Sequence, residues 1–385
     1  MSKDLNSANA TRKNNFKYIT SYQPNYHSTN SNNPPVRRKK RSKWRTLIVT
    51  TSVTVFVIIT IVIIWDIHNF SRASESLFGT ENAWEVLKTQ PLKRSSNNRT
   101  NILLIGYSID DPGHGGADLT DSILIVSLDN EHKSGYMLSV PRDLYVDIPM
   151  RGMARINEAY QVGEQTSFHE ENYPTGGVGM LQKLVTEIFG IDIHYSMIVD
   201  YASVKEIVNA LGGIKVEIRS NDPRGIYDPN FPSEQGGPLK LTNGIHKIDG
   251  QTALRLTRAR GSTYGSYGFA ESDFDRTKNQ QQIFLAIKNE LNWTLVLDPR
   301  TNGKIFEAAG KNLKTNLTIH ELIPFYRLLA TIPNRNLRPI SLSNIGHQTL
   351  LVEYVVPYSG ARVLIPSSGM NNYSTIQNVV QELNN

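Results

Sequence analysis

Three short clusters of arginine and carboxylate side chains stand out in this sequence because their residue types suit phosphate chemistry. A guanidinium is planar and always charged, and it can donate two parallel hydrogen bonds to a pair of phosphate oxygens. Arginines that converge from separate segments would therefore indicate phosphate chemistry. The clusters are Pro141-Arg142-Asp143, Arg258-Ala259-Arg260, and Asp273 with Arg276 and Gln280.

The third cluster is predicted to lie at the start of a helix. Ser272 followed by Asp275 resembles a capping box, so the helix should begin there. Asp273, Arg276 and Gln280 then share one helical face. Apolar residues continue this face, which we therefore expect to be buried: Ile283, Phe284, Ile287 and Leu291. A purely structural alternative is an ion pair between Asp273 and Arg276, three residues apart on one helix.

The other two clusters are predicted to lie on extended chain or at a strand end. Arg258 and Arg260 can point to the same side only if the chain between them is extended, because on a helix they would point in nearly opposite directions. We therefore predict an extended Arg-x-Arg clamp, with two solvated surface arginines as the alternative. Arg142 and Asp143 follow an apolar run that ends at Pro141, and α/β proteins usually place their sites at strand ends.

One stretch of the chain, residues 46–65, contains twenty residues without a charge and is long enough to cross a bilayer as a helix. Lysine and arginine dominate residues 37–45, and positively charged flanks stay in the cytoplasm. About 45 mostly polar residues precede the span, which favours an uncleaved signal anchor over a cleaved signal peptide. We therefore predict a single-pass cell-membrane protein with a cytoplasmic amino terminus and an extracellular C-terminal domain.

The composition divides the chain into four parts. Residues 1–45 are predicted to be a disordered basic tail, 46–65 the anchor, 66–99 a juxtamembrane stalk and 100–385 the extracytoplasmic domain. The tail holds 11 of the 41 Lys and Arg and one of the 35 Asp and Glu, which leaves 30 basic and 34 acidic residues beyond it. Because a nucleic-acid binder keeps its basic excess on the folded part, we expect the lipid bilayer, and no nucleic acid, as a partner.

The extracytoplasmic part alternates short apolar runs with amphipathic segments. The absence of cysteine excludes disulfides and thiol catalysis. Apolar runs predict strands at 101–106, 122–128, 136–140, 193–199, 214–218, 350–356 and 361–365. Helical spacing predicts helices at 178–189, 203–211, 276–297 and 319–330. Strands interleaved with helices indicate an α/β layered sandwich.

In these motifs the chain resembles the LytR-CpsA-Psr family, the membrane-anchored glycopolymer transferases of bacterial cell walls. The resemblance runs from about 101 to 281 and includes NILLIG at 101–106, SVPRDLYVDI at 139–148, the Arg-x-Arg and DFDRTKNQQQ at 273–282. It implies an α-β-α sandwich with a central mixed sheet. It also implies transfer of an anionic glycopolymer, teichoic-acid-like or capsular, from a polyprenyl-pyrophosphate carrier to peptidoglycan.

The resemblance further implies roles for single residues. It gives the pyrophosphate ligands as Arg142, Arg258, Arg260, Arg276 and Gln280. Asp121 would bind Mg²⁺, while Asp143 and Asp273 would orient arginines or accept a proton. Such a metal site is expected to be sparse, because Mg²⁺ is usually held by one or two carboxylates together with substrate phosphates.

The chain also departs from the family pattern. Ser108 stands where an aspartate is usual, so Asp110 or Asp111 is expected to supply the second carboxylate for the metal. Leu119 and Asn279 stand where arginines are usual. The prediction is an active enzyme with an altered site or a divergent substrate.

Two other functions stay open. A non-catalytic protein would use the same arginines to bind wall polymer or polyprenyl phosphate without metal, and an extracellular pyrophosphatase or phosphodiesterase would use water as the acceptor. An apparent insertion at 261–272 predicts a mobile rim loop. A polyprenyl chain would need a dry channel, and its candidate walls, for which core packing is the alternative, are Leu103, Ile105, Ile125, Ile283, Phe284 and Ile287.

Overall fold

The computed structural model of the chain describes residues 88–107, 119–270, 273–291, 313–342, 348–357 and 359–384. The predicted tail, membrane anchor and most of the stalk lie outside these residues, as do Ser108, Asp110, Asp111 and Ser272. Among the helices in the described ranges, none combines the length and apolar character that a membrane span requires.

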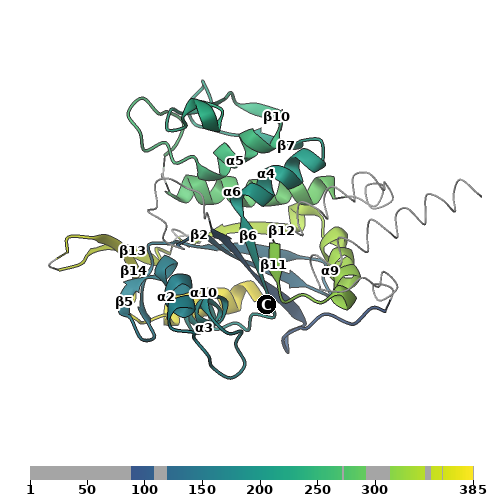
Figure 1. Cartoon of the computed structure of the whole chain (residues 1–385), viewed down its shortest axis with the longest axis vertical. Coiled ribbons are helices and arrows are strands. Elements are labelled where there is room, and N and C mark those ends of the chain that lie inside the picture. The colour runs from purple at the N-terminus through teal and green to yellow at the C-terminus, as the bar shows by residue number, and fades with distance from the viewer. Residues whose placement is uncertain are drawn as a thin grey trace, which may run out of the picture. The chain divides into compact units, whose positions relative to one another are not determined.

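The described residues form a central sheet of six strands, some parallel and some antiparallel (Figure 1). β1 pairs antiparallel with β2 and parallel with β6, while β3 pairs antiparallel with β2 and parallel with β12. The prediction of an α/β fold around a central mixed sheet is therefore confirmed. In sheet order the strands are β11 (Leu313–Thr315), β6 (Tyr195–Asp200), β1 (Arg99–Tyr107), β2 (Thr120–Asp129), β3 (Gly135–Val140) and β12 (Leu337–Ser341).

Helices cover both faces of this sheet. Because side chains alternate along a strand, Leu103 and Ile105 pack toward one face and Ile102 toward the other. The first face carries α2 (Ala159–Gln165), α3 (Gly177–Phe189) and α10 (Ser374–Asn384). The second carries α6 (Asp273–Glu290) and α9 (Ile319–Thr331).

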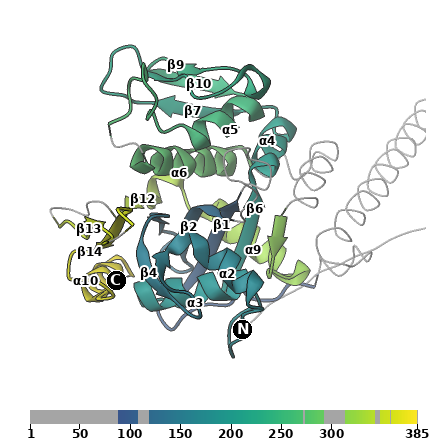
Figure 2. The ribbon, with the colours of Figure 1, turned by 60° about the vertical axis from the view of Figure 1, so that its left-hand side comes forward.

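A further layer packs on the far side of α6 (Figure 2). Ile283 is buried in the core of this layer, whereas Phe284 and Leu285 pack with the sheet. The expectation of one continuous face on this helix is therefore wrong for its second half, because α6 lies between two cores. The layer contains α4 (Tyr201–Ala210), α5 (Gly250–Arg258), β7 (Ile214–Ile218) paired with β10 (Gly244–Ile248), and β8 (Ile226–Asp228) paired with β9 (Leu239–Leu241).

Two hairpins lie outside the central sheet. They are β4 (Tyr145–Ile148) with β5 (Gly152–Arg155), and β13 (Leu351–Val355) with β14 (Arg362–Pro366). The two C-terminal strands predicted from the sequence thus pair with each other. Short 3₁₀ turns complete the described elements: η2 (Ile156–Glu158), η3 (Ser233–Gln235) and η4 (Asn334–Asn336).

Candidate functional site

The start of β2 and the end of β3 bring the first two charged residues of the site together. These strands run antiparallel with Ile123 opposite Val140, so the residues just outside this pair share one edge of the sheet. Arg142 Nη1 donates a hydrogen bond to Asp121 Oδ1 over 3.0 Å. The Asp121 side chain is only 5% exposed. The strand-end position predicted for Arg142 therefore places it beside the candidate metal ligand.

The first turn of α6 adds a carboxylate that contacts three arginines. Asp273 Oδ1 lies 2.9 Å from Arg276 Nη2, 3.6 Å from Arg260 Nε and 3.9 Å from Arg142 Nε. Arg276 is 3% exposed and also donates to the backbone oxygen of Asp121 over 3.1 Å. The ion pair between Asp273 and Arg276, which we considered as a structural alternative, is present. It is one part of a larger cluster that joins all three sequence motifs.

The cluster leaves positive charge and hydrogen-bonding capacity available. Burial lowers the pKa of Arg260, and repulsion from Arg276 and Arg142 lowers it further, although Asp273 and Asp121 partly oppose this. In the described part of the chain, the Nε atoms of Arg142, Arg260 and Arg276 are buried and make no hydrogen bond. Since buried donors are normally paired, these N–H groups are suited to an anionic ligand.

The Arg-x-Arg motif is only partly extended. Helix α5 runs through Arg258, and Ala259 takes extended dihedrals of φ −64° and ψ 130°. Arg258 Nη1 lies 3.4 Å from Gln235 Oε1, whereas Arg260 joins the cluster around Asp273. The prediction of an extended clamp is therefore wrong at Arg258, because this first residue of the motif is also the last residue of α5.

Gln280 lies one turn beyond Arg276 and bridges two elements. Its Oε1 accepts from Ser122 Oγ over 2.8 Å, and its Nε2 donates to the Thr257 backbone oxygen over 3.1 Å. An amide nitrogen carries two hydrogens, so one donor beyond the Thr257 bond is available for a phosphate oxygen. Gln280 thus also positions the end of α5 against β2, a role that its spacing did not predict.

Arg155 is a member of the site to which sequence reasoning gave no role. Its Nε lies 3.1 Å from Asp143 Oδ1, closer than the 3.7 Å between Asp143 Oδ2 and Arg142 Nε. Arg155 Nη2 also donates to the backbone oxygen of Arg362 on β14. The link depends on the β4–β5 hairpin, which pairs Tyr145 with Arg155 and is not visible in residue spacing. The available signal was the motif at 155–160, RINEAY, which begins with this arginine and also resembles the family.

The inserted segment is tethered over its described part, 261–270. Asp228 Oδ2 accepts the backbone N–H groups of Arg260 and Gly261, each over 3.0 Å. The Tyr267 and Tyr227 backbones exchange two hydrogen bonds, and their rings stack with centroids 5.3 Å apart. These contacts do not fit a freely mobile rim. They also fix the backbone that aims Arg260 into the cluster.

The candidate metal site rests on one described carboxylate. Asp121 offers the oxygen ligand that Mg²⁺ prefers, and Asp110 lies outside the described residues. Within the described ranges, no group of three or more His, Asp or Glu is placed to hold a metal ion. Asp121 fits Mg²⁺ as one of several ligands, since the arginines around it would repel a cation that arrives without an anion. Mg²⁺ stays a prediction.

Comparison with known families settles the relationship of the chain. The model of the LytR_cpsA_psr family matches residues 65–359. The chain belongs to this family. Two curated members show the level of similarity. The chain is 26% identical over 255 residues to the polyisoprenyl-teichoic acid–peptidoglycan teichoic acid transferase TagT of Bacillus subtilis, covering 66% of this chain and 70% of TagT. It is 27% identical over 253 residues to the regulatory protein MsrR of Staphylococcus aureus, covering 64% of each.

Solved structures share the fold of this LytR-CpsA-Psr protein. TagT bound to LI-WTA superposes with a TM-score of 0.54 at 23% identity, over 76% of this chain and 92% of that one. TagT with bound octaprenyl pyrophosphate lipid gives a TM-score of 0.51 at 20% identity, over 76% and 93%.

Proposed function

We propose that this protein transfers an anionic glycopolymer from a polyprenyl-pyrophosphate carrier to peptidoglycan at the outer face of the cell membrane. The observation that supports this most is the convergence of Arg142, Arg260 and Arg276 around Asp273, beside the buried Asp121. Family membership adds support, because relatives are named teichoic acid transferases and one solved relative is described with bound octaprenyl pyrophosphate.

The arginines would supply most of the catalysis. Their buried Nε–H groups would donate to oxygens of the pyrophosphate and stabilise the charge that increases as the polyprenyl phosphate leaves. Asp273 would keep the three guanidiniums close together by its contacts with each of them. Asp143, which pairs with Arg155, would orient Arg142 or accept the proton of the attacking sugar hydroxyl. Mg²⁺ bound through Asp121 would neutralise further charge on the phosphoryl oxygens.

The carrier's hydrocarbon chain needs an apolar route, and some of the side chains predicted to line it are tightly packed. Leu103, Ile105 and Ile125 are 0% exposed and pack with α3, so core packing, the alternative reading, holds for them. A pocket of about 670 Å³ reaches the same core at Ile148, Leu184 and Ile188, and none of its lining residues belongs to the arginine cluster. If the hydrocarbon chain binds between the sheet and α3, the side chains packed there would have to separate.

The Asp121→Asn variant tests the proposal and separates the transferase from its two alternatives. The substitution keeps the shape of the side chain, but it removes the charge that would bind Mg²⁺ and pair with Arg142. We expect loss of Mg²⁺-dependent transfer to peptidoglycan with a nearly unchanged melting temperature. Wild-type protein that works equally well in excess chelator would disprove metal assistance. Carrier binding without turnover would favour the binder, and release of free polymer without an acceptor would favour the hydrolase.

A further inference from the structure

A basic surface lies at the opposite end of β2 from the arginine cluster. Arg94, Lys133 and Arg327 come from three separate segments and line one pocket of about 290 Å³. Arg335 belongs to the same end, because its neighbour Asn336 donates a hydrogen bond to the backbone oxygen of Lys133. All four cations are exposed. We call this surface, formed by residues 88–98, 130–134 and 319–338, the basic end.

The charge of the basic end opposes that of the remaining domain. Its three segments contain seven Lys and Arg and two Glu, although residues 46–385 as a whole carry 30 basic and 34 acidic residues. Glu321 is buried, so Glu131 is the exposed carboxylate of these segments. The pKa of His132 is raised by its hydrogen bond to Asp129, which extends the positive charge to higher pH.

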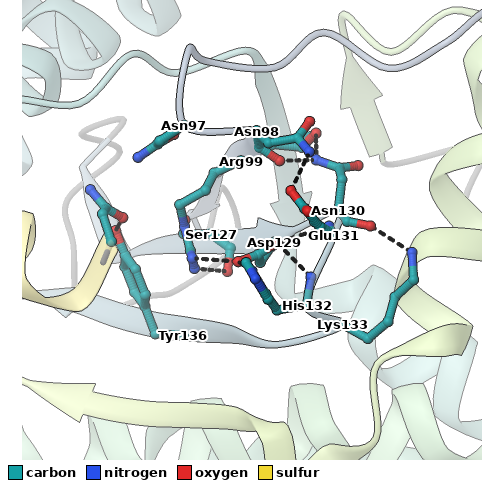
Figure 3. A network of polar contacts seen from close by, with 12 residues as sticks. Asn97, Asn98, Arg99, Ser127, Asp129, Asn130, Glu131, His132, Lys133 and Tyr136 are labelled. Carbon is teal, nitrogen blue, oxygen red and sulfur yellow. Dashed lines mark hydrogen bonds and ion pairs between the residues drawn. The ribbon is translucent and has the colours of Figure 1, made fainter.

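The turn that presents Lys133 is rigidly constructed (Figure 3). Asp129 Oδ1 accepts the backbone N–H groups of Glu131 and His132 over 2.8 and 2.9 Å. Asn130 Nδ2 donates to the backbone oxygen of Asn98, which joins the turn to the chain before β1. Lys133 itself takes the left-handed conformation, with φ 51°. Lys133 is therefore presented by a hydrogen-bonded turn.

The chain that leads back toward the predicted membrane anchor is fastened to the same end. Lys93 N donates to the hydroxyl of Tyr195, which in turn donates to Glu321 Oε1 over 2.6 Å. Gln90 N donates to the backbone oxygen of His320 at the start of α9. Tyr195 and Glu321 are buried, so these bonds are shielded from water. The described chain thus begins, at residue 88, beside the basic end.

We propose that the basic end rests on the anionic lipid headgroups of the membrane that carries the protein. This inference depends on the membrane anchor of the proposed function. Phosphate headgroups complement fixed, exposed arginines and lysines, and attraction to an anionic surface acts within about a Debye length. A soluble anionic polymer would meet the same charges, but the attachment of the anchor-side chain favours the lipid surface.

The experiment uses the full chain in nanodiscs of phosphatidylcholine, with or without an equal part of phosphatidylglycerol. Because the chain has no cysteine, a single Ser96→Cys substitution places a fluorescent label on the basic end. Quenching by nitroxide-labelled headgroups reports its distance from the membrane. A label at Tyr264→Cys, on the fully exposed tip of the 261–270 loop, is the control for general crowding.

We expect strong quenching at Ser96→Cys with phosphatidylglycerol, weak quenching without it, and little at Tyr264→Cys in either disc. Each cation near an anionic surface contributes about a fivefold preference, so Arg94→Gln, Lys133→Gln and Arg327→Gln together should lower the ratio of docked to undocked molecules roughly a hundredfold. The matched control changes three exposed lysines to glutamine in the layer on the far side of α6, which contains β7, β9 and β10: Lys215, Lys240 and Lys247.

Three results would overturn the inference. Equal quenching in both discs would show contact that does not need anionic lipid. Equal loss in the control triple variant would show a general charge effect. Competition by soluble polyglycerol phosphate, without dependence on phosphatidylglycerol, would assign the surface to the polymer. Failure of the chain to enter nanodiscs would instead refute the membrane anchor and leave transfer activity to be measured separately.

Discussion

The Arg260→Ala variant should lose transfer activity without losing stability. The Arg260 side chain is 31% exposed, and its ion-pair contact with Asp273 spans 3.6 Å, so the contact is worth no more than about 1 kcal/mol. Repulsion from Arg276 and Arg142 opposes even this gain. Removal of the guanidinium should therefore leave the free energy of unfolding unchanged or slightly higher. A charge-assisted hydrogen bond to pyrophosphate is worth about 1.5–3 kcal/mol, which corresponds to about ten- to hundredfold in rate.

The measurement pairs a transfer assay, with lipid-linked polymer and peptidoglycan, with thermal melting of the same preparations. Arg276→Ala is the contrasting variant, because that side chain is 3% exposed and bonds to both Asp273 and the Asp121 backbone. Its loss removes a hydrogen bond to the backbone oxygen of Asp121 and the shortest contact of Asp273, and it should cost about 1–3 kcal/mol of stability. Arg260→Lys should also be impaired, since an ammonium cannot grip two oxygens in one plane. Wild-type transfer by Arg260→Ala, or a melting loss equal to that of Arg276→Ala, would refute the reasoning.

Four further outcomes are expected. A cytoplasm-specific reporter should be active at the amino terminus and inactive at the carboxyl terminus, and the reverse pattern would contradict the topology. Arg155→Ala should release Asp143 and lower transfer about two- to fivefold, with less than about 1 kcal/mol change in unfolding free energy, measured by denaturant titration. Gln281→Leu should lower the free energy of unfolding by about 1–3 kcal/mol, because Gln281 Nε2 contacts three buried acceptors. The affinity for pyrophosphate, measured by calorimetry, should not change. Because the pKa of His132 is raised in the folded state, the wild type should have a higher melting temperature than His132→Asn below pH 6.5, the ordinary pKa of histidine. This difference in melting temperature should disappear as the pH rises through the folded-state pKa.

The parts of the fold that could be predicted are those in which local pattern and tertiary packing agree. The run at 214–218 became β7 with identical bounds, and the helix predicted at 178–189 became α3 with one residue added. Strand β12 was missed because Arg338 and Pro339 interrupt its apolar pattern, and parallel pairing with β3 supplies what the pattern lacks. Helix α5 was missed because it has only nine residues and buries Gly250 and Thr257 beside Ala253 and Leu256, so its apolar pattern is short.

The site divides in the same way. Asp273, Arg276 and Gln280 share a helix, so their common face followed from spacing alone. Contacts such as that between Arg155 and Asp143 depend on how a hairpin folds back, which no local pattern contains. Asp110 lies outside the described residues, so the second metal carboxylate stays a prediction.

The length of β2 has a consequence for the choice of substrate. Eight residue steps separate Asp121 from Asp129, which places the arginine cluster about 27 Å from the basic end along the strand. One leaflet of the hydrocarbon core is about 15 Å thick. If the basic end rests on headgroups, an ordinary diacyl lipid whose phosphate reached the arginines would be drawn completely out of the bilayer. With β2 perpendicular to the bilayer in that arrangement, a polyprenyl carrier longer than about 40 Å could reach the arginines with its far end still in the membrane. The length of β2 would then favour long carriers over short ones.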